Sequence, residues 1–421
     1  CDFRFKYSLF VWGIIVTAEI IVANKEAVSL AADSAMTVGN KIYDTGNKLF
    51  TLSKTHPIGI MISNSAEFMG VPWETLIKIY RDENLEKDHM GAVSDYALHF
   101  LNFILNGKCC SREQQENQLR NVVYSHISRV IQRSHSEWIS ELVQKGKCSK
   151  SKQSSIFHDG LVRYEKYLSN VDNYQFTNLT EYKLTRKSKQ VLNDGIDHAL
   201  GNIRLTQRSR VLAYRIAKLA IMKSDYASNF SDIAIAGFGK DEYFPSIEVV
   251  RIGGVFHDEL KFTRTNSIDI ARNGDISLIL PLAQREMVDR FMYGADSEYQ
   301  AIVNDYFTEF CLNLGMNQTQ SKAALQVFDN YMIQIRSKKF AEPISQSVIH
   351  LPKDELAKMA ESLVSLTSIK RRVSHNEQET VGGPVDVAVI SKGDGFVWIK
   401  RKHYFSPELN QNFSSLYLRG N

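Results

Sequence analysis

The sequence predicts an α+β protein with a helical insertion in the middle of the chain. Three observations lead to this class. Short alternating apolar runs fill residues 18–64, residues 85–225 carry helical periodicity, and strand-like runs return at 232–280 and 382–402. Because strands lie at both ends of the chain, we expect the two ends to pair in one or two sheets. This pattern predicts one domain with an insertion rather than two independent domains.

The first strands are expected as a hairpin over residues 18–32, with "NKE" (24–26) as its turn. The stretch "KLFTLSKTHPIGIMISNSA" (48–66) predicts two more strands around a Thr-His-Pro turn. A helix is expected from Ala66 to Arg81, and Pro72 is expected to kink or divide it.

The rest of the chain alternates between helical and strand signals. The pattern of residues 85–225 predicts several helices. A strand pair is expected next, formed by "DIAIAGFG" (232–239) and "SIEVVRIGG" (246–254), and another pair is expected over 255–280. Helices are expected over 284–371, where Pro352 suits the start of the last one. The final stretch, 382–402, predicts a hairpin around a Lys-Gly-Asp-Gly turn.

Composition excludes several classes of partner. A net charge of +4 over 421 residues is too small to indicate a nucleic-acid or membrane partner, and the basic segment 145–190 is interpreted as a solvated surface. The apolar run 7–16 is too short to span a membrane and lacks a clear signal-peptide cleavage site. The five cysteines show no metal-binding spacing, so we expect a cytoplasmic protein without metal or cofactor.

Thr17 is the candidate nucleophile. If it were the first residue, its hydroxyl would lie beside its own free α-amine, which can accept the hydroxyl proton. Such a site needs a cation beside the amine, a carboxylate that holds the cation, and backbone N–H groups for the oxyanion. Asp33, Lys48 and the turn at Ser63 and Asn64 supply these groups in order along the chain.

Residues 17–68, "TAEIIVANKEAVSLAADSAMTVGNKIYDTGNKLFTLSKTHPIGIMISNSAEF", resemble the start of a proteasome β-subunit or of the bacterial heat-shock-locus V peptidase. That family has an N-terminal Thr, an Asp at position seventeen and a Lys near position thirty-three. With Thr17 counted as one, Asp33 is seventeenth and Lys48 is thirty-second. The resemblance implies a four-layer αββα sandwich of N-terminal-nucleophile hydrolase type. It also implies Thr17 as nucleophile, Asp33 as orienting carboxylate, Lys48 as the cation, and an oxyanion amide at Ser63 or Asn64.

Other segments match this family more loosely. "MYGADSEY" resembles a Gly-x-Gly-Ser turn, which makes Ser297 either a supporting active-site serine or a helix cap. The family's Asp-x-x-Ser-Gly-Gly is replaced by "QETVGG", with Gln378 and Val381 at the Asp and Ser places, for which Glu377, Glu379 or Thr380 are possible substitutes. Asp386, in the last buried strand, is interpreted as an edge or interface residue.

The implied domain organisation has four parts. Residues 1–16 are a propeptide or an upstream extension, or translation starts at position 16. Residues 17–84 and 229–421 form the two parts of the core, and 85–228 form the helical insertion.

Three functions remain open. The first is a threonine peptidase that cleaves peptide bonds through an acyl-enzyme, the second is an amidohydrolase acting on a small amide, and the third is a catalytically silent scaffold. The resemblance implies a homo-oligomeric ring that degrades peptides or unfolded proteins. Since the chain carries no P-loop pattern, an ATP-driven unfoldase would be a separate protein.

Overall fold

The fold is known from a computed structural model, which combines α-helices with antiparallel sheets and so confirms that part of the prediction. The structure describes residues 18–38, 41–84, 89–107, 110–145, 149–174, 185–201, 203–227, 230–270, 272, 276–374, 382–406 and 409–410.

The first sheet contains the strands nearest to the two ends of the described chain. Its order is β12 (Ser277–Pro281), β1 (Glu19–Asn24), β2 (Ala27–Ala32), β13 (Asp386–Ser391) and β14 (Gly395–Lys400), with every pair antiparallel. β1, β2 and β13 are buried along their whole length, which accounts for their apolar sequences on both faces. The predicted hairpins at the two ends of the chain therefore lie side by side.

The second sheet is formed by the middle strands. Its order is β11 (Glu259–Asp269), β10 (Ser246–Phe256), β9 (Ser231–Gly237), β6 (Ile58–Asn64) and β5 (Leu49–Thr51). Two further pairs of short strands stand outside both sheets, β3 (Met36–Val38) with β4 (Lys41–Tyr43) and β7 (Glu67–Phe68) with β8 (Val71–Pro72).

The two sheets face each other across a shared apolar core. Side chains such as Ile21 and Leu30 from the first sheet meet Met61 and Ile247 from the second. Gly59 on β6 allows the sheets to approach, because an added Cβ would lie 2.7 Å from Cδ1 of Ile390 on β13 and 3.0 Å from Cδ1 of Leu30. Side chains of β1 that point the other way, such as Ile20 and Val22, pack into a separate cluster outside this space.

Replacing Gly59 with Val is expected to lower the free energy of unfolding by about 1–3 kcal/mol, because the new side chain overfills the contact between the sheets. Urea denaturation measures the effect. Gly393→Val is the control, since an added Cβ at Gly393 meets nothing within 4 Å. Equal losses in the two variants would contradict the close packing at Gly59.

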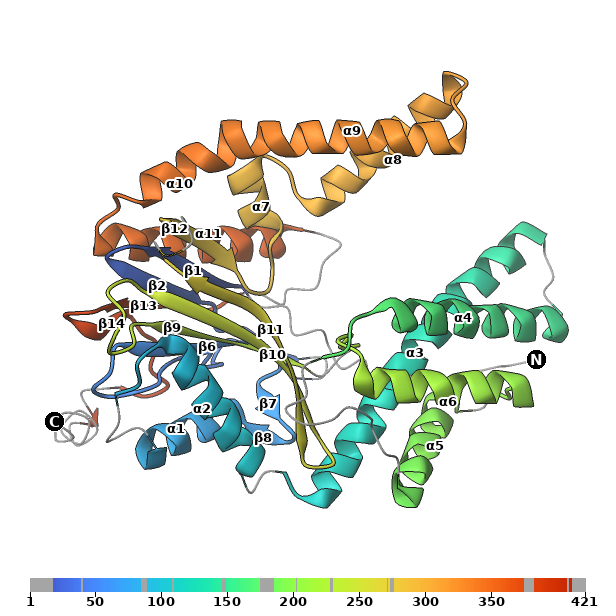
Figure 1. The fold of residues 1–421 in the computed structure, drawn as a ribbon, viewed down its shortest axis with the longest axis horizontal. Coiled ribbons are helices and arrows are strands. Elements are labelled where there is room, and N and C mark those ends of the chain that lie inside the picture. Colours follow the sequence, from blue (N-terminus) through green and yellow to red (C-terminus); the bar gives the residue numbers. More distant parts are fainter. Residues whose placement is uncertain are drawn as a thin grey trace.

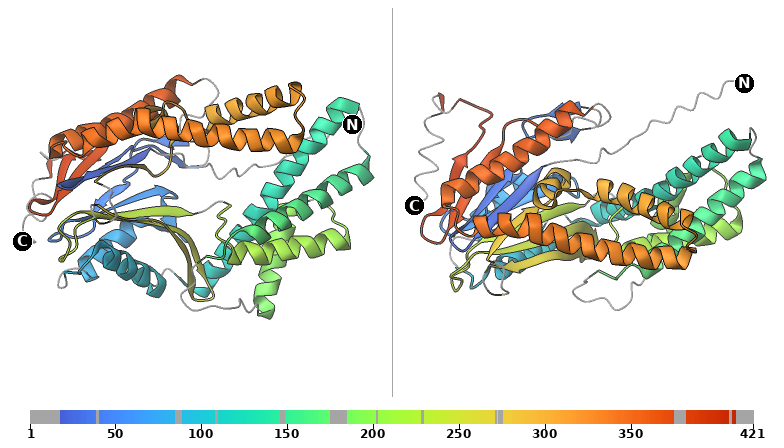
Figure 2. Two further views of the ribbon diagram at one scale, coloured as in Figure 1. Left: turned by 45° about the horizontal axis from the view of Figure 1, so that its top comes forward. Right: turned by 90° about the horizontal axis from the view of Figure 1, so that it is seen from above.

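Helices cover the outer faces of both sheets (Figures 1 and 2). α11 (Lys353–Val373) packs on β1, β2 and β13, and α1 (Trp73–Asn84) and α2 (Val93–Asn106) share a core with the second sheet. α11 begins directly after Pro352, as predicted.

The helix expected from Ala66 was wrong in its start, because residues 67–72 form the β7–β8 pair and α1 begins at Trp73. Pro72 lacks an N–H and stands immediately before the helix, where no helical bond is lost. Met69 and Gly70, both with positive φ, make the turn that separates β7 from β8.

The middle of the chain has its own core. It is built from α3 (Arg112–Lys145), α4 (Lys150–Asn170), α5 (Arg186–Leu200) and α6 (Gln207–Met222), and α3 also contacts β10. α2 belongs to the segment expected as an insertion but packs on the second sheet. The division of the chain at residues 84 and 228 stays a prediction.

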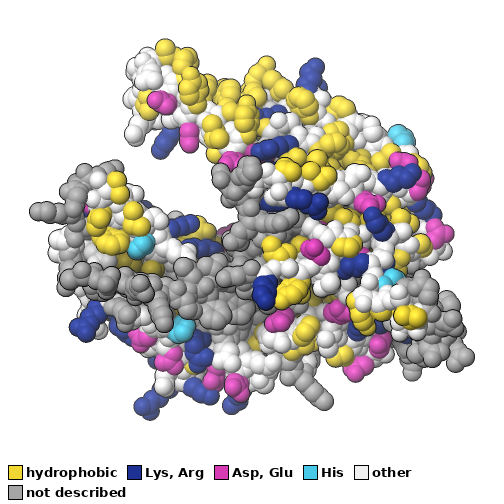
Figure 3. All heavy atoms as spheres, turned by 180° about the vertical axis from the view of Figure 1, so that it is seen from behind, with side chains coloured by type: hydrophobic (Ala, Val, Ile, Leu, Met, Phe, Trp, Pro, Cys, Tyr) yellow, Lys and Arg dark blue, Asp and Glu magenta, His cyan; other side chains and the backbone are white. Residues whose placement is uncertain are grey.

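A second group of helices precedes α11. It comprises α7 (Glu286–Tyr293), α8 (Ser297–Asn313), α9 (Gln318–Arg336), the π-helix η1 (Ser337–Ala341) and α10 (Glu342–Val348). α8 and α9 form an arm that projects from the sheets, and Figure 3 shows many hydrophobic side chains on it and a hollow between the arm and the α3–α6 group. In the part of the chain that the structure describes, no helix is both long enough and apolar enough to cross a membrane.

Candidate active site

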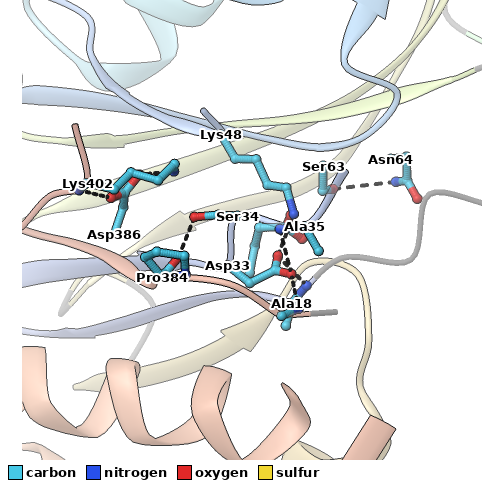
Figure 4. Close-up of polar contacts among 12 residues, drawn as sticks. Ala18, Asp33, Ser34, Ala35, Lys48, Ser63, Asn64, Pro384, Asp386 and Lys402 are labelled. Carbon is cyan, nitrogen blue, oxygen red and sulfur yellow. Dashed lines mark hydrogen bonds and ion pairs between the residues drawn. The ribbon is translucent and has the colours of Figure 1, made fainter. Parts of the chain in front are cut away.

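Asp33 directly follows β2, and four donors fix its buried carboxylate (Figure 4). Oδ1 accepts hydrogen bonds from the Ala18 N–H at 3.1 Å and from the Lys48 ammonium. Oδ2 accepts from the Gly382 N–H at 3.0 Å and from the Ala35 N–H at 3.4 Å. Such a carboxylate is held rigidly by the donors around it.

Lys48 comes from the other sheet, immediately before β5, and only 8% of it is exposed. Its ammonium binds Asp33 and lies 3.6 Å from Oε1 of Glu19 on β1. Its backbone carbonyl accepts a hydrogen bond from the Ile62 N–H at 2.9 Å, which ties the lysine to β6. The predicted pair of Asp33 and Lys48 therefore exists, and it joins the two sheets at one edge of the space between them.

The start of β1 is fixed to the same carboxylate. Ala18 donates its N–H to Oδ1 of Asp33 and accepts the Asp33 N–H at its carbonyl, both at 3.1 Å. Thr17 itself lies outside the described residues.

Glu19 is a member of the group that sequence reasoning missed. Its side chain is buried and lies between the sheets, beside the Lys48 ammonium. The sequence did contain a signal for this residue, because Glu19 is an ionisable residue in an otherwise apolar strand. Burying such a residue without a partner is costly, so its presence indicates a buried partner. Glu19 is also two positions after Thr17, and side chains two apart on a strand share a face.

Ser63 and Asn64 end β6, as expected, and Ser63 is buried. Asn64 has a left-handed backbone (φ 68°), and its Nδ2 donates to Oδ2 of Asp232 at 2.9 Å. Arg251 donates to both oxygens of Asp232, at 2.7 and 2.8 Å, so the Asn64 carboxamide belongs to a buried structural network. Within the described residues, no hydrogen bond joins Ser63 or Asn64 to Asp33 or Lys48, and the assignment of the oxyanion amide to either stays a prediction.

Ser297 lies elsewhere. It is the exposed first residue of α8, and Asp296 caps that helix by accepting the Tyr299 N–H at 2.8 Å. Gly294, with φ 71°, ends α7 just before it. The motif "MYGADSEY" therefore encodes a corner between two helices, and among the described residues no hydrogen bond or ion pair joins Ser297 to Asp33 or Lys48.

The closing Gly-Gly loop contacts the end of β2 beside Asp33. Ser34 donates its N–H to the Gly382 carbonyl at 3.1 Å and its hydroxyl to the Pro384 carbonyl. Together with the bond from the Gly382 N–H to Asp33, these contacts hold the loop against the end of β2. Gln378 and Val381, and the possible substitutes Glu377, Glu379 and Thr380, lie outside the described residues.

A second buried ion pair extends the charged group. Asp386 on β13 accepts the Lys402 N–H at 2.8 Å and the Lys402 ammonium at 2.5 Å. Burial lowers the pKa of Lys402 while Asp386 raises it, and the Lys48 ammonium lowers it further. The interpretation of Asp386 as an edge or interface residue was wrong, because β13 lies between β2 and β14 and its first side chain is buried.

The described residues contain no group of three or more His, Cys, Asp or Glu side chains that could hold a metal ion. The chemistry available is that of a buried cation beside two carboxylates, one of which also binds the Ala18 N–H.

Comparisons with known proteins gave matches only among solved structures. No family model and no curated protein matches the chain. The chain is similar to the Anbu complex of Pseudomonas aeruginosa, described as a helical assembly, with 9% identity, a TM-score of 0.31 and coverage of 95% of this chain and 94% of that one. It is also similar to Anbu (ancestral beta-subunit) from Yersinia bercovieri, with 9% identity, a TM-score of 0.28 and 95% coverage of both chains.

A third similar structure is Anbu from Hyphomicrobium sp. strain MC1, with 9% identity, a TM-score of 0.26 and coverage of 95% and 96%. The expected resemblance to a proteasome β-subunit or to the heat-shock-locus V peptidase was therefore wrong in the family that it named. At these TM-scores the matches carry no argument about activity, which has to come from the residues of this chain.

Proposed function

We propose that this chain is a threonine-type amide hydrolase of the N-terminal-nucleophile class that cleaves peptide bonds with the hydroxyl of Thr17. One observation carries the proposal. Ala18 is hydrogen-bonded through both its N–H and its C=O to Asp33, whose carboxylate binds the buried Lys48. This arrangement supports a position for Thr17 beside a fixed cation.

In the proposed reaction the free α-amine of Thr17 accepts the proton of the Thr17 hydroxyl, directly or through a water molecule. The oxygen bonds to the substrate carbonyl carbon, and the tetrahedral intermediate collapses as the protonated amine gives its proton to the leaving nitrogen. Water then attacks the resulting ester, and its proton passes through the same amine back to the Thr17 oxygen.

Lys48 has two roles in this scheme. Its positive charge lowers the pKa of an adjacent α-amine, so that the amine can act as a base near neutral pH, and it stabilises negative charge on the Thr17 oxygen. Asp33 and Glu19 both lie within ion-pair distance of the ammonium and hold the lysine in place.

We propose the four-layer αββα sandwich for the core, in which α11, the two sheets and the α1–α2 pair succeed one another. The assignment of 85–228 to an insertion between the core segments 17–84 and 229–421 is part of the same proposal. The separate core of α3–α6 supports it.

A homo-oligomer is proposed as the working form. The arm carries a row of exposed large apolar side chains, which on a protein surface indicates a contact site. They include Tyr299, Ile302, Tyr306, Val327, Tyr331 and Ile333. A separate unfoldase and an unfolded-protein substrate stay predictions.

The proposal is tested on two forms of the chain, one that retains residues 1–16 and one that a site-specific protease releases with Thr17 as its first residue. Both are treated with a β-lactone, a strained ester that acylates an activated hydroxyl, and are analysed by intact-mass and fragment spectrometry. We expect one adduct, on Thr17, in the released form alone, because only that form has the α-amine base.

An unlabelled Thr17 in a folded, released chain would contradict both enzyme functions and leave the catalytically silent scaffold. If Thr17 is labelled, hydrolysis of peptides compared with hydrolysis of small primary amides separates the peptidase from the small-amide hydrolase.

A further inference from the structure

A lysine is buried at the joint between the α3–α6 group and the second sheet, where α3 contacts β10 (Figure 1). Lys261 lies near the start of β11, and only 1% of it is exposed. Its ammonium donates hydrogen bonds to two main-chain carbonyls, that of Ala220 at 2.8 Å and that of Asp225 at 3.3 Å. Because an ammonium has three N–H groups, one donor is left over. Within the described chain, no carboxylate forms an ion pair with Lys261.

The charges around Lys261 do not cancel. The Asp225 carboxylate binds Arg129 on α3, whose NH1 lies 3.2 Å from both carboxylate oxygens, so that two cations share one carboxylate. The rings of Tyr174 and Tyr226 lie 5.0 and 4.7 Å from the Lys261 ammonium and stabilise part of the remaining charge. Since buried charges in proteins are normally paired, this group lacks one negative charge.

His126 on α3 supplies a second unused donor. Its side chain is fully buried, and its Nε2 has no hydrogen-bond partner among the residues that the structure describes. Its Nδ1 lies 2.9 Å from the Tyr164 hydroxyl on α4, which accepts a bond from Arg129 at 3.3 Å. In the described chain Nδ1 is the one acceptor left for the Tyr164 hydroxyl hydrogen, so the network assigns the imidazole hydrogen to Nε2.

The imidazole is neutral. Burial lowers the pKa of His126 well below its usual range, and the charges of Lys261 and Arg129 lower it further. A neutral ring that accepts at Nδ1 has one donor, the Nε2–H.

Both donors line one small cavity. Its volume is about 10 Å³, which holds one water-sized particle and excludes phosphate, sulfate and carboxylate ligands. Gly253, at a β-bulge of β10, keeps this space open, because an added Cβ would lie 2.8 Å from the Tyr226 ring and 3.2 Å from Cδ of Lys261. The lining consists of Val122, His126, Asp225, Tyr226, Ala227, Gly253 and Lys261.

We propose that this cavity binds one chloride ion, which accepts hydrogen bonds from the Lys261 ammonium and from the Nε2–H of His126. A monatomic anion suits a cavity of this size, and its single charge matches the excess of one positive charge. A water molecule would accept the same two bonds but would leave that charge uncompensated. The ion joins α3 to β11, so chloride strengthens the attachment of the α3–α6 group to the second sheet.

The ionisation of Lys261 is consistent with a bound anion. Burial lowers the pKa of Lys261 to about 7, while the Asp225 charge raises it. An adjacent anion favours the charged ammonium over the neutral amine. Chloride therefore stabilises the charged form of the group that binds it.

The test combines crystallography with folding equilibria of the full chain. Crystals soaked in sodium bromide locate the site, because bromide replaces chloride and scatters anomalously. Urea unfolding is then compared in sodium chloride and in sodium gluconate at the same ionic strength. A ligand of the folded state raises the folding equilibrium constant, and gluconate is too large for the cavity. The chloride ratio is the folding constant in chloride divided by that in gluconate.

Four variants separate the two donors. Lys261→Met removes the charge, His126→Leu removes the imidazole donor, and His126→Gln replaces the imidazole N–H with an amide N–H. Lys218→Met, at an exposed lysine of α6, is the matched control. Circular dichroism establishes that each variant is folded.

We expect one bromide within hydrogen-bond distance of Nζ of Lys261 and Nε2 of His126. The chloride ratio of wild type should exceed that of Lys261→Met about 3- to 10-fold, the effect of a ligand present at a few times its Kd. The ratio for His126→Leu should lie within about 1.5-fold of Lys261→Met. His126→Gln and Lys218→Met should stay within about 2-fold of wild type.

Three results would overturn the proposal. These are equal chloride ratios in wild type and in a folded Lys261→Met or His126→Leu chain, a water molecule in the cavity of the bromide-soaked crystals, or a loss in His126→Gln as large as in His126→Leu. The two His126 variants decide the case if Lys261→Met does not fold. The site shares no residue with the proposed active site, so the outcome of Thr17 labelling does not affect it.

Discussion

Replacing Thr17 with Ala is expected to abolish peptide hydrolysis by the released chain, with kcat falling on the order of 10⁴- to 10⁶-fold. The hydroxyl is the only group in the proposed mechanism that bonds to the substrate, and the α-amine cannot replace it in forming the ester. Steady-state hydrolysis of a fluorogenic peptide at neutral pH measures the loss.

The matched control is Thr17→Ser, which keeps both the hydroxyl and the α-amine. Because the reacting groups remain, this variant should retain activity within about 10-fold of wild type. The free energy of unfolding should change little in either variant. The described contacts that fix this end of β1 are made by the backbone of Ala18. Residual hydrolysis by the Thr17→Ala chain at wild-type rate would rule out Thr17 as the nucleophile.

The paired strands at the two ends of the chain were predictable from local patterns. The alternation of apolar and polar residues, together with a continuous apolar run, predicted the β1–β2 hairpin. A Gly-containing turn between two apolar runs predicted the β13–β14 hairpin. Spacing alone selected Asp33 and Lys48, which the structure joins in one ion pair. These features are local, or depend on a count along the chain.

What the sequence did not show depends on contacts between distant segments. The bond from the Gly382 N–H to Asp33 joins residues 349 positions apart, and no local pattern encodes it. Glu19 becomes part of the site only when β5 brings Lys48 across from the second sheet.

Ser297 is a residue whose local sequence allowed two interpretations. A small-residue turn followed by a helix occurs both at active sites and at ordinary helix corners, and the local sequence is the same in the two cases. Here Asp296 caps the helix and Ser297 is exposed, which only the packing of α7 and α8 reveals.

Replacing Lys48 with Met is expected to lower the free energy of unfolding by about 3–5 kcal/mol, the usual effect of removing one partner from a buried ion pair. The substitution preserves most of the side-chain volume but leaves the carboxylates of Asp33 and Glu19 buried without their cation. Urea denaturation at pH 7 measures the loss.

Adding Glu19→Gln to Lys48→Met should restore about 1–2 kcal/mol, because it removes one of the two uncompensated charges. Lys353→Met is the control. The Lys353–Asp394 pair is also short, at 2.6 Å, but both side chains are largely exposed, so this change should cost less than about 1 kcal/mol.

The combination of stability and activity separates the two roles of Lys48. If the Lys48→Met and Glu19→Gln double variant is folded at the assay temperature but fails to acylate Thr17, then the cation is required for the chemistry and not only for the joint between the sheets. If Lys48→Met is as stable as wild type, the buried charge group is not the joint that the contacts indicate. The position beside Lys48 that we propose for Thr17, on which the peptidase proposal depends, then loses its support.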